Sequence, residues 1–299
     1  MIGSIKMSQK MHAVQVMQVN RPMVSVMQDL VERLDLPSHA SYICVKPNLC
    51  EYRCKESGAT SDPEVVDSML FALRRKYPVA RIRIIENDAT GVSADRIFGF
   101  LGIDDVAKKH DCEVLNVANE PWVRRQVDGC LYTTIRIPKC VQDSDLFITH
   151  PKLKTHGGTK ITCSLKNQFG LFKPKNKIPF HSHLDEAIVD SNLAALPQVS
   201  IVDANLCMEG NGGPIFGTPK QVGLIVGGTD IVSVDSFCAR LAGFRPYFVG
   251  HIRKAAKKKL GDMAYRVVQD GDPIRYSDHK FKFNRFLYHA LKIVRQRVR

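Results

Sequence analysis

A segment near the middle of the chain gathers residues that could bind and transform an anion. Residues 151–171 read PKLKTHGGTKITCSLKNQFGL and contain His156 and the pair Gly157 and Gly158. With one position just beyond the segment, it also supplies five lysines: Lys152, Lys154, Lys160, Lys166 and Lys173. Lysine ammonium groups neutralise carboxylate or phosphate, and glycines let a ligand approach the backbone closely. The segment therefore predicts a pocket for a small anionic ligand.

Several of these residues are candidates for catalysis. A lysine that is buried among other cations has a lowered pKa and can act as a base or a nucleophile. A histidine exchanges protons near neutral pH. Lys160 follows the glycine pair and is our first choice, although a solvated run of surface charge is the alternative. The candidate catalytic residues are Lys160, His156, Lys166 and Asn167.

Five apolar runs predict strands, and each ends in a polar or glycine-containing loop. They cover residues 41–45, 81–85, 145–149, 199–202 and 222–226. Ligands of parallel sheets bind beyond the carboxyl ends of the strands, so we expect the polar residues there to face one cleft. The candidate ligand-binding residues are Lys46, Asn48, Lys152, Lys154, Gly157, Gly158, Asp88, Thr90, Gly210 and Gly212.

Helical patterns alternate with these strands, at residues 63–76, 93–109, 185–196 and 231–242. The alternation predicts an α/β fold, with a largely parallel (Rossmann-like) sheet and helices on both faces. Residues 1–250 would form this domain, either as one unit or as two sub-lobes that divide near residue 150. Residues 157–171 could form a further helix, with Ile161, Leu165 and Phe169 on its buried face and Lys160 toward the cleft.

Histidines, carboxylates and thiols suggest two possible metal sites. The spacing of His181 and His183 puts both rings on one side of an extended segment, as a divalent metal or iron would require, although surface histidines fit equally well. The candidate metal ligands are His181, His183, Asp203 and Glu209. Cys44, Cys50 and Cys54 form a loose cluster that could hold an iron–sulfur group, but reduced thiols in the core or in loops are the favoured interpretation.

Positive charge is concentrated at the end of the chain. The protein has 299 residues and a formal net charge of +13, and residues 251–299 alone contain 14 lysines and arginines against 4 acidic residues. Apolar spacing over 281–298 predicts a basic C-terminal helix, and residues 251–299 read as a basic helical extension. This extension could dock on the body, or residues 275–299 could bind an anionic membrane surface or an acidic protein. Nucleic acid is the least favoured partner, because no known binding module accompanies the charge.

The N-terminal residues lack the apolar core of a signal peptide, and no run of 18 apolar residues occurs. We therefore expect a cytoplasmic protein, with peripheral attachment to a membrane as the alternative.

Several blocks together resemble the family catalogued as domain of unknown function 362. They are VKPNL at 45–49, the KLKTH and SLKNQFGL segments within 152–171, the later histidines, and the stretch from Val202 to Phe244. The resemblance covers roughly residues 40 to 262 and implies a cytoplasmic α/β protein, often found beside iron–sulfur modules. Many relatives carry a ferredoxin-like cysteine run, which this sequence lacks. The stretch from His156 to Lys160 is also similar to a region of the nickel-pincer lactate racemases, in which the lysine carries the cofactor.

Three functions are compatible with these observations. The favoured one is an enzyme that acts on a small anionic substrate through lysine and histidine acid–base chemistry, or with the help of a metal. The second is a redox module in which the three cysteines ligate iron. The third is a non-catalytic protein that binds a ligand and attaches to an acidic surface through its basic tail.

Overall fold

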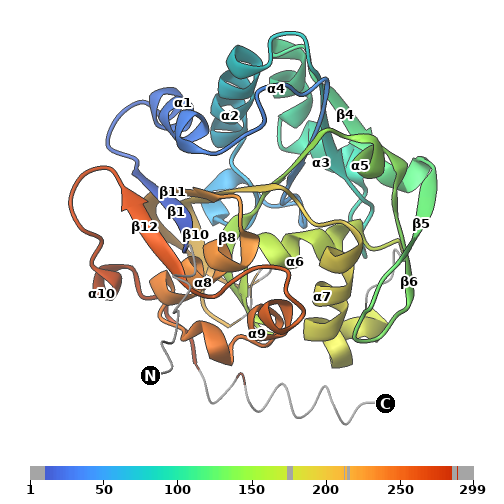
Figure 1. The fold of residues 1–299 in the computed structure, drawn as a ribbon. Helices are drawn as coiled ribbons and strands as arrows, with labels where there is room; N and C mark the ends of the chain where they lie inside the picture. The colour runs from blue at the N-terminus through green and yellow to red at the C-terminus, as the bar shows by residue number, and fades with distance from the viewer. Residues whose placement is uncertain (1–10, 174–177, 212, 214–215, 285–287, 289–299) are drawn as a thin grey trace, which may run out of the picture.

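A computed structural model describes residues 11–173, 178–211, 213, 216–284 and 288. One large sheet forms its centre (Figure 1). In spatial order its main strands are β12 (Tyr265–Gln269), β1 (His12–Gln18), β11 (Thr218–Gly228), β10 (Val199–Glu209), β7 (Leu146–His150), β2 (Tyr42–Pro47), β3 (Arg81–Glu86) and β4 (Glu113–Asn116). The five strands from β10 to β4 pair in parallel, whereas β11 runs antiparallel to both of its neighbours.

Two short strands extend this sheet beside β10. β8 (Lys152–His156) pairs in parallel with β10, and β9 (Lys160–Thr162) returns antiparallel to β8. A separate hairpin is formed by β5 (Trp122–Gln126) and β6 (Thr134–Pro138). Strands from both sides of residue 150 therefore belong to one sheet. β12 belongs to the same sheet, although it lies in the segment expected to be a helical extension.

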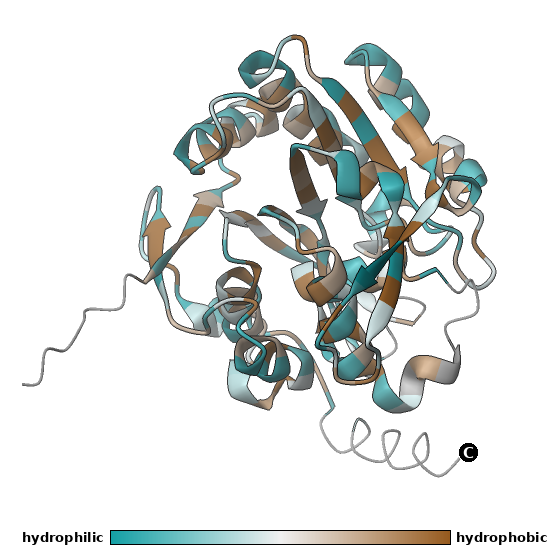
Figure 2. Cartoon of the chain, turned by 45° about the vertical axis from the view of Figure 1, so that its right-hand side comes forward, coloured by the Kyte–Doolittle hydropathy of each residue, from teal (hydrophilic) through white to brown (hydrophobic). Residues whose placement is uncertain are grey.

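Alternating side chains of the strands feed two hydrophobic cores, one on each face of the sheet. On β2, for example, Ile43 and Val45 enter one core and Cys44 enters the other. On β7, Leu146 and Ile148 face the first core and Phe147 faces the second. Figure 2 shows apolar residues concentrated along the central strands. Burial on both faces explains why these strands read as continuous apolar runs.

Helices cover both faces, as the sequence predicted. The first core is covered by α1 (Met23–Arg33), α2 (Pro63–Lys76), α3 (Ala94–Phe100) and α4 (Ile103–Lys109). The second is covered by α6 (Ser164–Gln168), α7 (Leu184–Ala194), α8 (Ile231–Leu241) and α9 (Gly250–Lys257). Shorter elements are α5 (Lys139–Asp143), α10 (Tyr276–His279) and the 3₁₀ turns η1 (Lys55–Ser57), η2 (Val117–Asn119), η3 (Phe169–Leu171), η4 (Ile178–His183) and η5 (Pro246–Phe248). Within the described residues, no helix combines the length and the apolar character needed to cross a bilayer.

The predicted strands and most predicted helices are confirmed, but two helices are wrong. The pattern over 93–109 is broken into α3 and α4 at Gly102, whose φ of 72° a continuous helix does not allow. The segment 157–171 is not one helix, because a β-hairpin occupies its first part and only Ser164–Gln168 is α-helical. The predicted basic helix over 281–298 lies largely outside the described residues.

Candidate functional site

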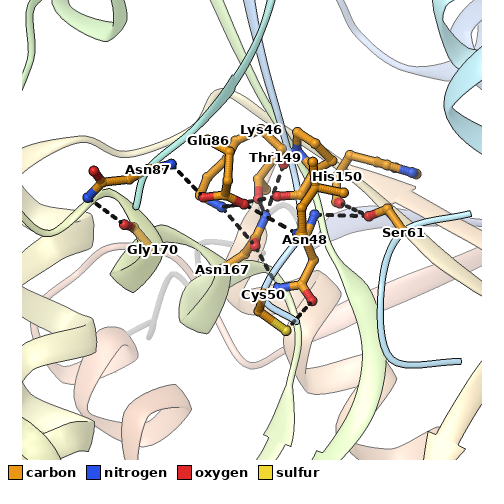
Figure 3. A network of polar contacts seen from close by, with 12 residues as sticks. Lys46, Asn48, Cys50, Ser61, Glu86, Asn87, Thr149, His150, Asn167 and Gly170 are labelled. Atoms are coloured by element: carbon orange, nitrogen blue, oxygen red, sulfur yellow. Dashed lines mark hydrogen bonds and ion pairs between the residues drawn. The ribbon is translucent and has the colours of Figure 1, made fainter. Parts of the chain in front are cut away.

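A cavity of about 250 Å³ opens beyond the carboxyl ends of β2 and β3, and α6 and η3 form its opposite wall. We call it the β2–α6 cavity. Its described lining residues are Lys46, Asn48, Leu49, Cys50, Glu86, Asn87, Ala89, Thr90, Lys166, Asn167, Phe169 and Gly170. In Figure 3 the polar groups of Lys46, Asn48, Glu86 and Asn167 point toward one another. Because β2 and β3 are parallel neighbours, their ends bring Lys46 and Glu86 together across 40 positions of sequence.

A buried ion pair closes the base of this cavity. The Lys46 Nζ lies 2.9 Å from Glu86 Oε2, and it also donates to the carbonyl of Pro47 at 3.0 Å and to Asn167 Oδ1 at 3.4 Å. The backbone N–H groups of Leu49 and Asn87 donate to the Glu86 carboxylate. Since every proton of the Lys46 ammonium has a partner, this residue offers a ligand its charge rather than a free donor.

Asn167 fixes α6 to the sheet. Its Nδ2 donates to the carbonyl of Lys46 and to Thr149 Oγ1, both at 3.0 Å, and its Oδ1 accepts from Asn48 Nδ2 at 3.1 Å. The side chain is 2% exposed. Its hydrogen-bonding capacity is nearly filled by the protein, so Asn167 positions other residues of the cavity.

A second buried lysine stands behind the cavity. Lys154, on β8, is 1% exposed and donates to Asn48 Oδ1 at 2.7 Å, to Cys50 Sγ at 3.1 Å and to the carbonyl of Ala59. None of these acceptors is a carboxylate. The ammonium of Lys154 therefore adds positive charge to the neighbourhood without a neutralising partner.

Lys166 is the lysine that remains available to a ligand. It lines the cavity from α6, is partly buried, and has no hydrogen bond or ion pair with any described residue. Burial, together with the nearby charges of Lys154 and Lys46, lowers the pKa of Lys166 from its ordinary 10.5 to about 8. Its helix is held in place because the N–H groups of Ser164 and Leu165 donate to the buried carboxylate of Asp235 at 2.8 and 3.0 Å.

Gly170 allows the two walls to meet. A Cβ at this position would lie 2.9 Å from both Cε and Nζ of Lys46 and 3.4 Å from Glu86 Oε1. Asn87 secures the same turn, since its Nδ2 donates to the carbonyls of Gly170 and Phe172 at 3.1 Å. Neither Asn87 nor Gly170 was assigned to the site from the sequence, although Asn87 follows the predicted strand 81–85 and Gly170 lies within SLKNQFGL. Glu86, at the end of that strand, was expected to face the cleft, and it lines the cavity.

Five predicted site residues thus line one cavity: Lys46, Asn48, Thr90, Lys166 and Asn167. Lys154 touches it from behind. Asp88 lies near the same strand end, where its Oδ1 accepts from the N–H of Ala94 at 2.9 Å and from Asn116 Nδ2 at 3.1 Å. That carboxylate stabilises the start of α3 and is not among the cavity-lining residues.

Lys160 and its neighbours lie elsewhere. They belong to the β8–β9 hairpin, where Lys160 has a φ of 68° and His156 Nδ1 accepts from the N–H of Gly158 at 3.0 Å. The Lys160 Nζ donates to the carbonyl of Phe248 at 2.5 Å and stands 5.4 Å from the ring centroid of Tyr288. It lines a different hollow of about 490 Å³. The predicted convergence of Lys160, His156, Gly157 and Gly158 with the strand-end lysines is therefore wrong.

Lys152 and Asp203 form a fully buried ion pair at 2.7 Å, so neither faces a ligand as predicted. Asp203 also accepts from the N–H of Asp62 at 3.1 Å. This pair ties β8 to β10 in the core, and both charges are satisfied there.

Of the remaining predicted metal ligands, only Glu209 and His183 have described side chains, and these two do not form a common site. Glu209 accepts from the N–H of Lys282 at 2.8 Å and faces the ammonium groups of Lys282 and Lys220. His183 is exposed at the start of α7, and the side chain of His181 lies outside the described residues, as does Gly212. Gly210 donates its N–H to the carbonyl of Lys282 at 2.9 Å.

Among the described residues, no three histidine, cysteine, aspartate or glutamate side chains are grouped so that they could hold a metal ion. The cysteine cluster is also dispersed. Cys44 is buried in β2, Cys50 lines the cavity, and Cys54 is exposed. The part of the chain that the structure describes thus offers no set of ligands for the predicted metal or iron–sulfur group.

Comparisons with known proteins agree with the resemblance seen in the sequence. A family model described as "Domain of unknown function (DUF362)" matches residues 43–240. Thylakoid-associated protein sll1697 from Synechocystis is 30% identical over 145 residues, which are 46% of this chain and 44% of the relative. The lactate racemase apoprotein from Thermoanaerobacterium thermosaccharolyticum has a TM-score of 0.46 and 10% identity, over 77% of this chain and 57% of that one.

Proposed function

Because this chain belongs to the DUF362 family, whose description assigns no reaction, we propose a function from the β2–α6 cavity itself. We propose that the protein is an enzyme that binds a small carboxylate- or phosphate-bearing molecule in this cavity and uses Lys166 to transfer a proton. The observation that carries the proposal is Lys166, a cavity-lining lysine without a hydrogen bond or ion pair to the described residues.

The charges around the cavity support an anionic ligand. Lys46, Lys154 and Lys166 bring three ammonium groups to it, whereas Glu86 is the single carboxylate among its described lining residues. In a partly desolvated site this excess of positive charge attracts a small anion strongly. The volume of about 250 Å³ suits a molecule of a few heavy atoms rather than a dinucleotide.

The pKa of Lys166 supports a proton-transfer role. With a pKa of about 8, roughly a tenth of the side chain is neutral at neutral pH, and that neutral amine can accept a proton. The resulting ammonium can return the proton to the substrate or to the product. The fixed charges of Lys46 and Lys154 would stabilise negative charge that develops on a carbon next to the bound carboxylate.

The proposal is tested in two steps. Isothermal titration should show that inorganic phosphate or oxalate binds the wild-type protein and binds the Lys166→Met variant at least tenfold more weakly. Incubation of small carboxylates in deuterium oxide, followed by proton NMR, should then reveal exchange of a carbon-bound proton that depends on Lys166.

The matched control is Lys173→Met, because Lys173 is exposed and lies against the Trp122 ring outside the cavity. Equal anion affinity in the wild type and in both variants would show that the anion does not bind next to Lys166. If anion binding depends on Lys166 but no tested carboxylate exchanges a proton, the protein is a ligand-binding protein and the enzymatic proposal is wrong.

A further inference from the structure

The turn η5 exposes two aromatic side chains next to each other. Tyr247 and Phe248 are each 57% exposed, and their ring centroids lie 5.7 Å apart. The exposure is not the result of a loose segment, because Phe244, Pro246 and Val249 on either side are buried. A paired display of this kind on a well-packed turn indicates a contact surface.

Cations without acidic partners surround this pair. Arg245 is exposed beside it, and the guanidinium of Arg253 on α9 lies 5.3 Å from the ring centroid of Tyr247. Lys257, one turn further along α9, is also exposed. None of these three forms an ion pair with a described carboxylate, whereas the intervening Lys254 is neutralised by Glu186 at 3.2 Å.

The surface is hollowed on both sides of η5. One hollow, of about 490 Å³, is lined by Lys160, Arg245 and Phe248 among others. The other, of about 610 Å³, is lined by Arg240, Arg245 and Tyr247 among others. The described residues that line these two hollows include no aspartate or glutamate.

We propose that this η5 surface, formed by Lys160, Arg240, Arg245, Tyr247, Phe248, Arg253 and Lys257, docks on an anionic lipid bilayer. Aromatic rings settle at the boundary between headgroups and acyl chains, and arginine and lysine bind the lipid phosphates. A uniformly negative surface fits cations such as Arg245, Arg253 and Lys257, which are exposed around the rings and form no ion pair with a described carboxylate. An acidic protein would instead have to place carboxylates at several fixed points.

The inference goes beyond the proposed enzymatic function, since it uses no residue of the β2–α6 cavity. The surface lies on the face of the sheet covered by α8 and α9, which are drawn in the lower half of Figure 1. The helices α1 to α4 cover the other face. This division provides control positions that are remote from η5.

The test is co-sedimentation of the full chain with vesicles of phosphatidylcholine mixed with phosphatidylglycerol, and with vesicles of phosphatidylcholine alone. The wild type should pellet only with the anionic vesicles. Tyr247→Ser with Phe248→Ser should weaken this binding at least tenfold. Arg253→Gln and Lys257→Gln should each weaken it about fivefold, the usual effect of one cation near an anionic membrane.

Matched controls on the other face are Phe100→Ser, which removes an aromatic ring that is 55% exposed on α3, and Arg75→Gln on α2. Both should bind like the wild type, and circular dichroism should be unchanged in all variants. Every variant keeps the basic C-terminal residues, so a difference between variants reports on η5. Wild-type binding to the anionic vesicles by the aromatic double variant would overturn the proposal.

Discussion

Replacing Lys166 by methionine should stabilise the folded protein while it removes anion binding. Folding lowers the pKa of Lys166 from 10.5 to about 8 through burial and the charges of Lys154 and Lys46. The folded state therefore resists protonation of a group that the unfolded chain protonates freely. The corresponding free-energy cost is about 3 kcal/mol below pH 8 and disappears as the pH rises toward the unfolded pKa. Methionine keeps an apolar stem, and no hydrogen bond to a described residue is lost.

The assay is urea unfolding of the wild type and of the Lys166→Met variant across a range of pH. The variant should be more stable by up to about 3 kcal/mol near pH 7, and this advantage should fall by about 2 kcal/mol by about pH 9.5. The control Lys173→Met concerns an exposed side chain, so its stability should change by less than about 0.5 kcal/mol at any pH. A Lys166→Met variant that is less stable at pH 7, or an advantage that does not shrink with pH, would refute the electrostatic reasoning.

Three further predictions concern the walls of the cavity and the core beside it. Gly170→Ala should destabilise the protein by about 1–3 kcal/mol and weaken phosphate binding, since the new methyl group meets a buried ammonium; unchanged thermal melting and titration would contradict this. Asp203→Asn should cost about 3–5 kcal/mol in urea unfolding, because it removes the carboxylate partner of the buried Lys152 ammonium; a loss below about 1 kcal/mol would contradict this reasoning. Phosphate should slow alkylation of Cys50 but not of exposed Cys54, as followed by mass spectrometry, and equal protection of both thiols would place the anion elsewhere.

The fold was largely predictable because its central strands are buried on both faces. Such strands read as uninterrupted apolar runs, and the intervening helical patterns then imply parallel connections. Helix α2 had strong local signals as well. Asp62 caps it by accepting from the N–H of Glu64, Pro63 begins it, and three basic residues end it. Its predicted bounds and its observed bounds are the same.

The β8–β9 hairpin could not be predicted because its strands are defined by distant partners. Lys152 and Lys154 are lysines in a strand, and only their contacts with Asp203 and Asn48 make burial possible there. Those partners lie 51 and 106 positions away in the sequence. A local reading of the same residues favours a solvated loop followed by a helix.

The same limitation explains why the site was predicted in part. Residues at the ends of β2 and β3 could be placed together, since neighbouring parallel strands end at one edge. The choice of Lys160 as the central residue failed because the hairpin turns that side chain away from the cavity, toward Phe248 and Tyr288. Lys166 lies only six positions later, but its helix is held on the cavity wall by Asn167 and Asp235.

The contrast among the buried lysines leads to a last prediction. Lys152 and Lys46 are each paired with a carboxylate, whereas Lys154 has only neutral acceptors and the thiol of Cys50. After burial itself, Lys154 makes the largest contribution to lowering the pKa of Lys166. Lys154→Met should therefore raise the pKa of Lys166 and weaken phosphate binding.

Competitive acetylation with isotopic labels measures the pKa of Lys166 directly. The acetylation rate of each lysine side chain is proportional to the fraction of it that is neutral, and this fraction changes with pH. In the wild type Lys166 should reach half of its limiting rate near pH 8. In Lys154→Met the midpoint of Lys166 should move upward, because the charge of Lys154 is gone. An unmoved midpoint for Lys166, in a variant whose circular dichroism is unchanged, would mean that the charge of Lys154 is not what prepares Lys166 for proton transfer.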